Sequence, residues 1–268
     1  MSKPDRQKCV FVTGAGSGIG RATAQLFAER GWFVGLFDVN AEGLDETAAS
    51  LPEGQRLSML FDVRDRHGWA RAVEAFGQAT GRRMDVLFNN AGIARGGWFE
   101  DVPPEEAELV VDVNIKGVLN GVYACLPLLR ETPGARIVNT ASVAGIYGAP
   151  RMAVYSATKF AVRGLTEALD LEFSRYGVRV TCLMPWFIET PLLDMASSVD
   201  SNRRAKDALR ESGTPIYPVR LAAERAWDAA HGGAIHYMAG KLAERARFAA
   251  RFMPALVRAQ MKQFMRDG

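Results

Sequence analysis

The sequence predicts an α/β fold in which a parallel sheet of about seven strands carries helices on both faces. Short apolar segments alternate along the chain with longer segments of helical periodicity. The connections between them are short, which favours parallel strands joined through helices. The strand segments are apolar throughout, as in Val86-Leu87-Phe88, which is the pattern of strands buried on both faces. A chain of 268 residues without internal repeats fits a single domain of this class.

Each expected element follows from its local pattern. β-rich segments predict strands near residues 8–13, 32–37, 56–61, 84–88, 135–141, 178–184 and 234–238. Helical periodicity predicts helices near residues 18–30, 41–50, 65–79, 104–130, 153–175, 190–210 and 218–231. The helix at 104–130 is expected to be broken. Pro103-Pro104 suits its start, and Pro133-Gly134 suits a turn into the fifth strand.

A glycine-rich turn follows the first strand. Gly14-Ala15-Gly16-Ser17-Gly18-Ile19-Gly20 stands between the strand that ends at Thr13 and the first helix. Glycines let the backbone approach a pyrophosphate, and the helix N-terminus offers it unpaired N–H groups and a positive dipole end. This order of strand, turn and helix is the context that a dinucleotide-binding motif requires. It predicts a Rossmann-like nucleotide site in the amino-terminal half.

An acidic residue ends the second strand segment. Asp38 follows the apolar run from Trp32 to Phe37 and stands eighteen residues after Gly20. A carboxylate at this place accepts hydrogen bonds from the adenosine ribose hydroxyls and repels a 2′-phosphate. No Arg or Lys stands at positions 15–17 or 39, so the sequence favours NAD over NADP. The alternative is that Asp38 only caps the helix expected from Ala41.

Tyr155 and Lys159 are the most informative pair for the chemistry. Their flanks lack Gly and Pro, so the segment is expected to be helical and to place both side chains on one face. A phenol with a pKa of about 10 becomes a useful base only when a nearby cation stabilises its anion. Ser142 stands thirteen residues before Tyr155. Taken alone, such a Tyr and Lys pair also fits ordinary packing beside a solvated charge.

Together these motifs resemble the short-chain dehydrogenase/reductase family in its compact single-domain form, over roughly residues 8–190. The spacing of Gly14, Gly18 and Gly20 is that of the family's glycine motif. Five further motifs stand in the family's order: Asp62-Val63, Asn89-Asn90-Ala91-Gly92, Asn114 in Val113-Asn114-Ile115-Lys116-Gly117, Asn139-Thr140-Ala141-Ser142, and Tyr155-x-x-x-Lys159.

The resemblance implies a catalytic tetrad of Asn114, Ser142, Tyr155 and Lys159. Tyr155 is implied to exchange the proton, and Lys159 to hold the nicotinamide ribose and lower the tyrosine pKa. Ser142 is implied to bond the reacting oxygen, and Asn114 to hold a water near the lysine. The residues expected to bind the cofactor are Gly14, Ser17, Gly18, Ile19, Gly20, Asp38, Asp62, Val63, Asn90, Ala91, Gly92, Tyr155, Lys159, Pro185, Ile188 and Thr190.

The implied function is an NAD-dependent oxidoreductase that interconverts a secondary alcohol and a ketone or aldehyde by hydride transfer. One alternative is a redox sensor or scaffold that binds NAD without turnover, although a complete tetrad argues against it. Another is a nucleotide-sugar epimerase or dehydratase, whose chains usually carry a substantial carboxyl-terminal domain. The resemblance also implies a homodimer or homotetramer built on the helices at 104–130 and 153–175, and no metal site is expected.

Trp186 departs from the family pattern. A glycine usually follows the proline that stands here as Pro185, and it lets the backbone pass close to the nicotinamide. An indole at this place either fills an apolar wall or shapes the access of the substrate. A lid is expected over about residues 190–219. The expected substrate pocket is apolar and includes Ser142, Tyr147, Met152, Trp186, Phe187 and Leu192.

The segment 241–268 goes beyond the minimal family pattern, so the chain is expected to divide into a nucleotide-binding domain at 1–240 and a basic amphipathic tail. The tail carries seven Lys and Arg against two acidic residues, a net charge of +5, which leaves −2 for residues 1–240. Pro254 is expected to interrupt its helix. We favour a tail that packs over the substrate pocket or a neighbouring subunit. The alternative is a helix that lies on an anionic membrane surface.

Composition limits the partners. A net charge of +3 gives no reason to expect a nucleic-acid partner. Cys9, Cys125 and Cys182 lie in apolar segments without CxxC spacing, and no secretory signal precedes them, so reduced and buried thiols are expected. The sequence contains no run of eighteen apolar residues, so it predicts no membrane-spanning helix. We expect a cytoplasmic protein that acts on a small, apolar alcohol or ketone.

Overall fold

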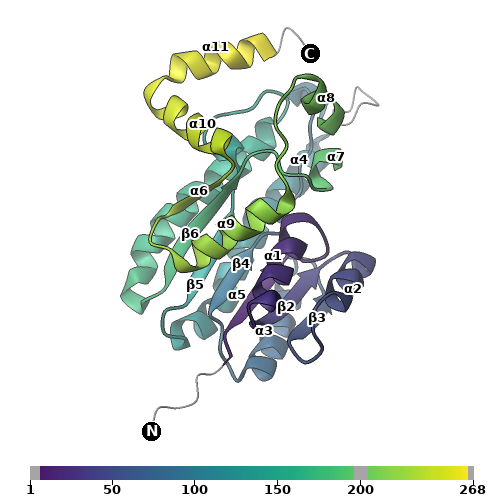
Figure 1. The fold of residues 1–268 in the computed structure, drawn as a ribbon, viewed down its shortest axis with the longest axis vertical. Coiled ribbons are helices and arrows are strands. Elements are labelled where there is room, and N and C mark those ends of the chain that lie inside the picture. The colour runs from purple at the N-terminus through teal and green to yellow at the C-terminus, as the bar shows by residue number, and fades with distance from the viewer. Residues whose placement is uncertain (1–6, 196–204, 265–268) are drawn as a thin grey trace.

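The computed structural model describes residues 7–195 and 205–264. The strands are β1 Cys9–Thr13, β2 Phe33–Asp38, β3 Arg56–Leu60, β4 Val86–Asn89, β5 Arg136–Thr140, β6 Arg179–Pro185 and β7 His236–Ala239. They form one sheet in the order β3-β2-β1-β4-β5-β6-β7, and every neighbouring pair is parallel (Figure 1). The doubly wound α/β fold that the sequence predicts is confirmed.

Helices connect the strands. The α-helices are α1 Gly18–Glu29, α2 Ala41–Ala49, α3 Arg66–Thr80, α4 Pro104–Val111, α5 Gly117–Glu131, α6 Ala153–Phe173, α7 Leu192–Met195, α8 Ala205–Glu211, α9 Val219–His231, α10 Lys241–Phe252 and α11 Pro254–Phe264. A π-helical turn, η2 Asp112–Lys116, joins α4 to α5. The short 3-10 turns are η1 Phe99–Asp101, η3 Val143–Gly145 and η4 Ser174–Tyr176.

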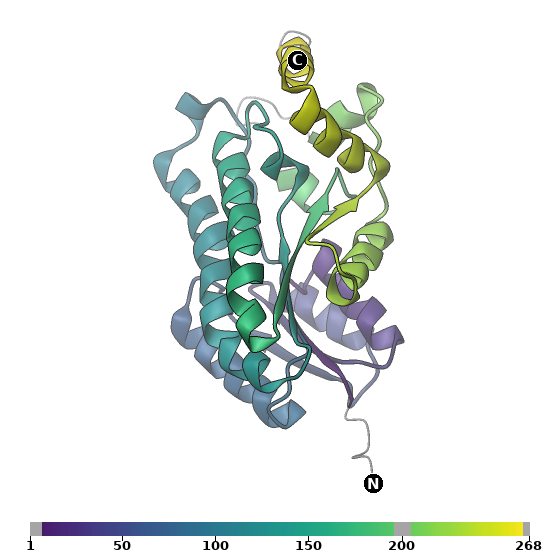
Figure 2. The ribbon, with the colours of Figure 1, turned by 90° about the vertical axis from the view of Figure 1, so that its left-hand side faces the viewer.

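The helices form one layer on each face of the sheet (Figure 2). Residues of α1, α2 and α9 pack with Val10 and Val12 on one face, whereas α3, α5 and α6 pack with Cys9 and Phe11 on the other. The second face is rich in aromatic rings, and the rings of Phe11 and Phe37 stack with centroids 3.7 Å apart. Because successive residues of a strand point to opposite faces, a strand covered on both sides is apolar throughout.

The order of the strands reverses at the middle of the sheet. From β1 the chain runs outward through β2 and β3, then returns to place β4 on the other side of β1 and continues to β7. The connections that leave the carboxyl ends of β1 and β4 therefore part in opposite directions. A crevice at such a switch point is where open α/β sheets bind their ligands.

Two expected helices differ from the simple pattern. The expected helix at 104–130 is broken as predicted, and the break is the π-helical turn in which Gly117 N–H donates to the carbonyl oxygen of Asp112. The expected helix at 190–210 is described only as α7 and α8, because 196–204 lie outside the described residues. The other bounds agree with the expected ones within two residues.

The carboxyl-terminal segment forms two helices. α10 ends at Phe252 and α11 starts at Pro254, which confirms the interruption expected at that proline. Residues 265–268 of the expected tail lie outside the described part of the chain. Of the described helices, only the continuous stretch Pro104–Glu131 is long and apolar enough to cross a membrane by length and composition. Its second half packs against α3 and the sheet, as a core helix does.

Candidate active site

The glycine-rich turn leaves no room for side chains at two of its glycines. Gly14 has φ +68°, and a Cβ there would lie 2.9 Å from Cα of Ala91. A Cβ on Gly20 would lie 1.9 Å from the carbonyl oxygen of Gly14. α1 therefore begins directly against the end of β1, and its N-terminal N–H groups face the switch point of the sheet. This cradle fits a dinucleotide pyrophosphate.

The turn is closed from the other side by the segment after β6. A Cβ on Gly18, whose φ is +51°, would lie 3.0 Å from Cγ2 of Thr190. Ser17 is the N-cap of α1, and Ile19 packs against the core cluster that contains Ile188. Ile188 also pairs with Tyr217, and Pro185 is the last residue of β6. The expected cofactor residues from the first and sixth strand regions thus lie together.

Asp38 is fixed to the turn by two hydrogen bonds. Its Oδ2 accepts from the Gly16 N–H at 2.8 Å, and its Oδ1 accepts from the Asn40 N–H at 2.9 Å. The alternative that Asp38 caps α2 is wrong, because Asn40 is the N-cap and its side chain accepts from the Gly43 N–H. The carboxylate stands at the carboxyl end of β2, next to the glycine-rich turn.

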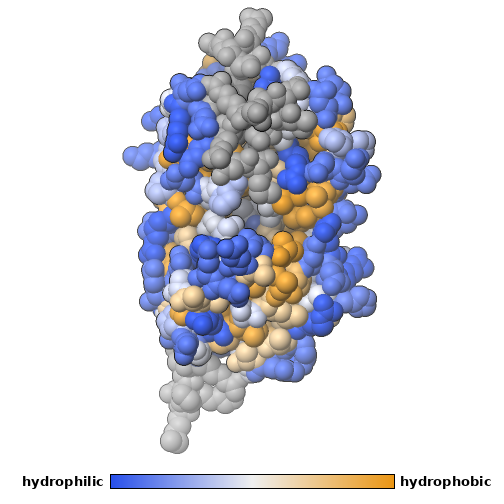
Figure 3. Space-filling model, turned by 90° about the vertical axis from the view of Figure 1, so that its right-hand side faces the viewer, coloured by the Kyte–Doolittle hydropathy of each residue, from blue (hydrophilic) through white to orange (hydrophobic). Residues whose placement is uncertain are grey.

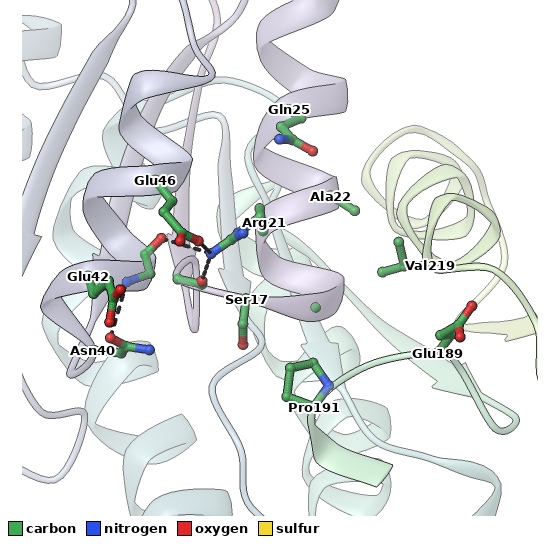
Figure 4. A pocket seen from close by; sticks show the side chains of 13 residues that line it. Ser17, Arg21, Ala22, Gln25, Asn40, Glu42, Glu46, Glu189, Pro191 and Val219 are labelled. Carbon is green, nitrogen blue, oxygen red and sulfur yellow. Dashed lines mark hydrogen bonds and ion pairs between the residues drawn. The ribbon is translucent and has the colours of Figure 1, made fainter. Parts of the chain in front are cut away.

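A cavity of about 550 Å³ lies on the outer side of this turn (Figure 4). Arg21 reaches into it from α1, where its Nη2 donates to Glu46 at 2.7 Å, to the carbonyl of Gly43 at 3.2 Å and to that of Gly16. Glu189, Pro191 and Val219 face it from the opposite side. On the side of the molecule shown in Figure 3, hydrophilic and hydrophobic residues are interspersed.

The end of β4 is bonded to the end of β1. Oγ1 of Thr13 accepts from the N–H groups of Asn90 at 3.0 Å and Ala91 at 3.1 Å, and Nδ2 of Asn90 donates to the carbonyl of Thr13 at 3.1 Å. Gly92 follows, and a Cβ there would lie 3.5 Å from Nζ of Lys159. The strand-four residues therefore connect the glycine-rich turn with Lys159.

Asp62 and Val63 follow β3, and their polar groups form interactions with other residues of the protein. Asp62 forms an ion pair with Arg64 at 2.6 Å, which lowers the pKa of its carboxyl. The carbonyl of Val63 accepts from Trp69 Nε1 at 2.9 Å, and its side chain is buried. The pair stands at the same carboxyl edge of the sheet as Asp38.

Tyr155 and Lys159 lie on α6, with Ser142 before η3. Tyr155 and Lys159 are both buried, and Ser142 lies close enough to the phenol of Tyr155 to lower its pKa. Nζ of Lys159 donates to the carbonyl of Thr140 at 2.9 Å and lies 5.5 Å from the centroid of the Tyr155 ring. α6 packs against η3, which brings the serine to the tyrosine. The three expected catalytic side chains are thus brought together at the end of β5.

Burial governs the pKa values of this group. It raises the pKa of Tyr155 to about 12, and the neighbouring Ser142 opposes this rise. It lowers the pKa of Lys159 from 10.5 to about 8. The lysine donates to the carbonyl of Thr140, and the lowering of the tyrosine pKa that was expected from the lysine is not seen. The phenol is therefore protonated at neutral pH, a state in which it can donate a proton.

Asn114, the fourth expected catalytic residue, lies in the π-helical turn and is buried. Its Nδ2 donates to the carbonyl of Ile93 at 2.9 Å and to Oγ1 of Thr158 at 3.1 Å, and its Oδ1 accepts from the Ile93 N–H at 2.9 Å. A π turn often marks a functional site. The side chain ties the segment after β4 to α6 and so positions the residues around Lys159.

The expected substrate residues separate into two groups. Met152 and Leu192 pack with Tyr155, together with Ala94 and Ala144. Trp186 instead packs against the core cluster that contains Val143 of η3, Met238 of β7 and Ala243 of α10. Its Nε1 is buried and has no hydrogen-bond partner among the described residues. Phe187 contacts the indole edge-on at 5.4 Å, and burial raises the pKa of Tyr147.

Sequence reasoning missed several residues that build the site. Thr13 bonds the end of β4, Thr140 holds the lysine, and Ala94 and Ala144 line the tyrosine. Thr13 and Thr140 each end an apolar strand segment, and a polar residue at that place was a usable signal. Arg21 follows the last glycine directly, but its contact with Glu46 on α2 depends on helix packing.

The comparisons with known proteins agree with this geometry. The family model for short chain dehydrogenase matches residues 8–201. Levodione reductase from Leifsonia aquatica is 38% identical over 195 residues, covering 70% of this chain and 72% of that protein. The 3-oxoacyl-[acyl-carrier-protein] reductase FabG from Thermotoga maritima is 39% identical over 190 residues, covering 70% and 76%.

A solved structure is similar over nearly the whole chain. It is the crystal structure of a short chain dehydrogenase/reductase from Burkholderia phymatum in complex with NAD, with a TM-score of 0.80 and 28% sequence identity. The match covers 95% of each chain. On the family model, the identities and the fold, this chain belongs to the short-chain dehydrogenase/reductase family, whose members are oxidoreductases that bind a nicotinamide cofactor and act on small molecules.

Proposed function

We propose that the protein is an NAD-dependent oxidoreductase that interconverts a secondary alcohol and a ketone or aldehyde. The observation that carries this proposal is the buried tyrosine of α6, which has Ser142 beside it and Lys159 one helical turn away, at the carboxyl edge of the sheet. The glycine-rich turn lies at the same edge. A proton-transfer group and a nucleotide cradle are what a hydride-transferring enzyme needs in one crevice.

The residues present fit the cofactor. The two glycines that would clash with any side chain, Gly14 and Gly20, leave the backbone bare for a pyrophosphate. Asp38 would accept the hydroxyls of the adenosine ribose, Asp62 and Val63 would border the adenine, and Lys159 would hold the nicotinamide ribose. When bound, NAD(H) supplies the hydride acceptor or donor.

NAD is proposed over NADP because of charge. Asp38 stands at the end of β2 with both carboxylate oxygens engaged by backbone N–H groups, so its negative charge is held at the turn. A 2′-phosphate there would meet this charge. Arg21 is the nearby cation, and Glu46 and two backbone carbonyls already occupy its Nη2.

Side chains of the protein transfer the proton to and from the substrate oxygen. In reduction, the protonated Tyr155 donates its phenolic proton to the carbonyl oxygen as the hydride arrives at the carbon, and Ser142 bonds the same oxygen. In oxidation, Tyr155 removes the alcohol proton. Burial moves the pKa of the phenol further above neutral pH, so Tyr155 holds the proton that reduction requires. The names of the levodione and 3-oxoacyl relatives, both reductases, point the same way.

The substrate is proposed to be apolar. Ala94, Ala144, Met152 and Leu192 surround Tyr155 with hydrocarbon. Such a wall stabilises an apolar substrate by removing its surface from water, by about 25 cal/mol per Å². Leu192 belongs to α7 in the proposed lid, and Glu189, which directly precedes the lid, pairs with Lys206 of α8 at 2.8 Å.

The proposal extends to assembly and compartment. Tyr123 on α5 and Leu171 on α6 are apolar side chains 74% and 76% exposed, which supports a homodimer or homotetramer built on these helices. The three cysteines are buried and unbridged, which supports residence in the cytoplasm.

The experiment is a panel of ketones and secondary alcohols from short to steroid-sized, followed by NADH absorbance, with NADPH in parallel. Turnover with NADH that is lost in Tyr155→Phe supports the proposal. The alternative of a redox sensor or scaffold without turnover predicts NAD binding by thermal shift and no reaction across the panel. A preference for NADPH would overturn the assignment of NAD as the cofactor but not the proposed reaction.

A further inference from the structure

The outer face of the carboxyl-terminal helices is apolar and exposed. Phe248 and Phe252 of α10 are 59% and 62% exposed, and their ring centroids lie 4.8 Å apart. Met253 and Leu256 continue this surface into α11, at 41% and 49% exposed. Four large apolar side chains in nine residues therefore lie on the surface of one segment. Exposed apolar clusters of this kind mark interaction sites.

The same helices carry cations that have no ion-pair partner. Within residues 205–264 and the rest of the described chain, no salt bridge reaches the six cations Lys241, Arg245, Arg247, Arg251, Arg258 and Lys262. Glu244 is the one acidic residue of α10 and α11. Elsewhere many exposed arginines are paired, as Arg82 is with Glu131 and Arg71 with Asp65.

Cations and aromatic rings share one side of α10. Lys241, Arg245, Phe248 and Phe252 follow the i, i+4, i+7, i+11 spacing that places residues on one helical face. The opposite face is anchored, because Ala243 is fully buried in the cluster with Trp186 and Met238. Val257 similarly buries one side of α11. The apolar and basic side is therefore the side left outward.

We propose that α10 and α11 form a docking surface for an anionic lipid bilayer. Aromatic rings interleaved with cations suit the boundary between headgroups and acyl chains, where the rings enter the hydrocarbon and the cations meet lipid phosphates and carboxylates. The free cations change the preference that the sequence alone gave to a tail covering a neighbouring subunit. A two-fold contact between two copies of this surface would set cations against cations.

The surface lies at the end of the molecule where the active site opens. In Figures 1 and 2, α10 and α11 rise from β7 at the same end of the sheet as α7 and α8. α10 packs against η3, the turn that follows Ser142. A bilayer on this surface would face the carboxyl edge of the sheet. This placement points to membrane-dissolved alcohols or ketones as substrates, a step that rests on the proposed function.

The test is flotation of the full chain with vesicles, without cofactor or substrate, so that its outcome does not depend on turnover. The probes are phosphatidylcholine vesicles and vesicles containing 30 mol% phosphatidylserine. We expect binding to the anionic vesicles that weakens as the salt concentration rises. Arg245→Gln with Arg251→Gln should lower the partition coefficient about 30-fold, since each surface cation contributes about fivefold. Phe248→Ser with Phe252→Ser should lower it at least about tenfold.

Matched controls change the same residue types elsewhere. Arg71→Gln with Arg82→Gln removes two exposed cations, and Phe99→Ser removes a phenylalanine that is 70% exposed. Both should bind vesicles as the parent chain does, and circular dichroism establishes that every variant folds. Equal binding to neutral and anionic vesicles, or no binding, overturns the proposal.

Two other partners could bind the surface of α10 and α11, a second copy of the chain or duplex DNA, and each gives a distinct experimental result. If the phenylalanine variant dissociates an oligomer in light scattering and the parent chain does not bind vesicles, a second copy covers the surface and the proposal is wrong. Binding to duplex DNA that needs the arginines but not the phenylalanines, in a chain that does not float with vesicles, would also overturn it.

Discussion

Nζ of Lys159 donates a 2.9 Å hydrogen bond to the carbonyl oxygen of Thr140, the last residue of β5. This bond fixes the lysine one helical turn from Tyr155 and leaves burial to set both pKa values. A buried cation with one carbonyl partner costs stability, and a bound cofactor ribose would give it further acceptors. The site is thus arranged for a ligand at a cost to the free protein.

Lys159→Met tests this cost. The folded pKa of about 8 lies below the ordinary 10.5, so between these pH values the unfolded chain binds more protons than the folded one. The contribution of this group to stability therefore rises as pH rises through that window. At pH 7 we expect the variant to be more stable by about 1–3 kcal/mol, less at pH 9.5. Urea unfolding of both proteins at the two pH values measures this, and a difference independent of pH contradicts a buried ammonium.

Gly20→Ala tests the contact between α1 and β1. Its Cβ would lie 1.9 Å from the carbonyl of Gly14, so the helix or the turn must move. We expect a loss of about 3 kcal/mol or more in the free energy of unfolding and loss of NAD binding. Gly164→Ala is the control, because that exposed glycine of α6 has open space around it. It should be stabilised by about 0.5–1 kcal/mol. Equal effects of the two substitutions on stability would contradict the claim that Gly20 is required for the close contact between α1 and β1.

Asp38→Asn tests the choice of cofactor. The amide oxygen can still accept from the Gly16 N–H, whereas the bond from the Asn40 N–H is lost together with the negative charge. We expect kcat/KM with NADP to rise by about tenfold or more relative to NAD. Initial rates with both cofactors measure the ratio. An unchanged ratio in a variant of unchanged Tm would show that Asp38 does not select the cofactor.

Trp186→Gly tests the departure from the family glycine. The indole packs against the core cluster that contains Val143, Met238 and Ala243, so its loss opens a cavity and should cost about 2–4 kcal/mol. Trp186→Phe should keep most of the stability. If the indole only fills the wall, KM for a short ketone stays within about twofold in Trp186→Phe. A tenfold rise in KM there, at unchanged thermal stability, would instead show that the indole shapes substrate access.

The sequence predicted the fold because its signals are local. Apolar strands such as Val86-Leu87-Phe88, and the turn from Gly14 to Gly20, each carry their own pattern. The break in the helix at 104–130 was expected, but its π-helical form was not. That form accompanies the bonds of Asn114 to Ile93 and Thr158, which only the packed structure brings together.

The electrostatics of the site were the harder part. The spacing of Tyr155 and Lys159 indicates one helical face, yet which neighbour the ammonium bonds depends on the path of β5. Likewise the cations of α10 were visible in the sequence, whereas their lack of ion-pair partners within residues 7–195 and 205–264 depends on which acidic side chains pack nearby. Side-chain chemistry is local, but the burial and pairing that tune it are tertiary.

The most direct measurement follows the hydride itself. The protein is incubated with a ketone from the active panel and NADH carrying deuterium at the transferring position, and the alcohol product is analysed by mass spectrometry. The account predicts one deuterium at the carbinol carbon with the wild-type chain, and a rate about 10²–10⁴-fold lower in Tyr155→Phe. A product without deuterium, or a Tyr155→Phe variant that forms the labelled alcohol at the wild-type rate, would contradict it.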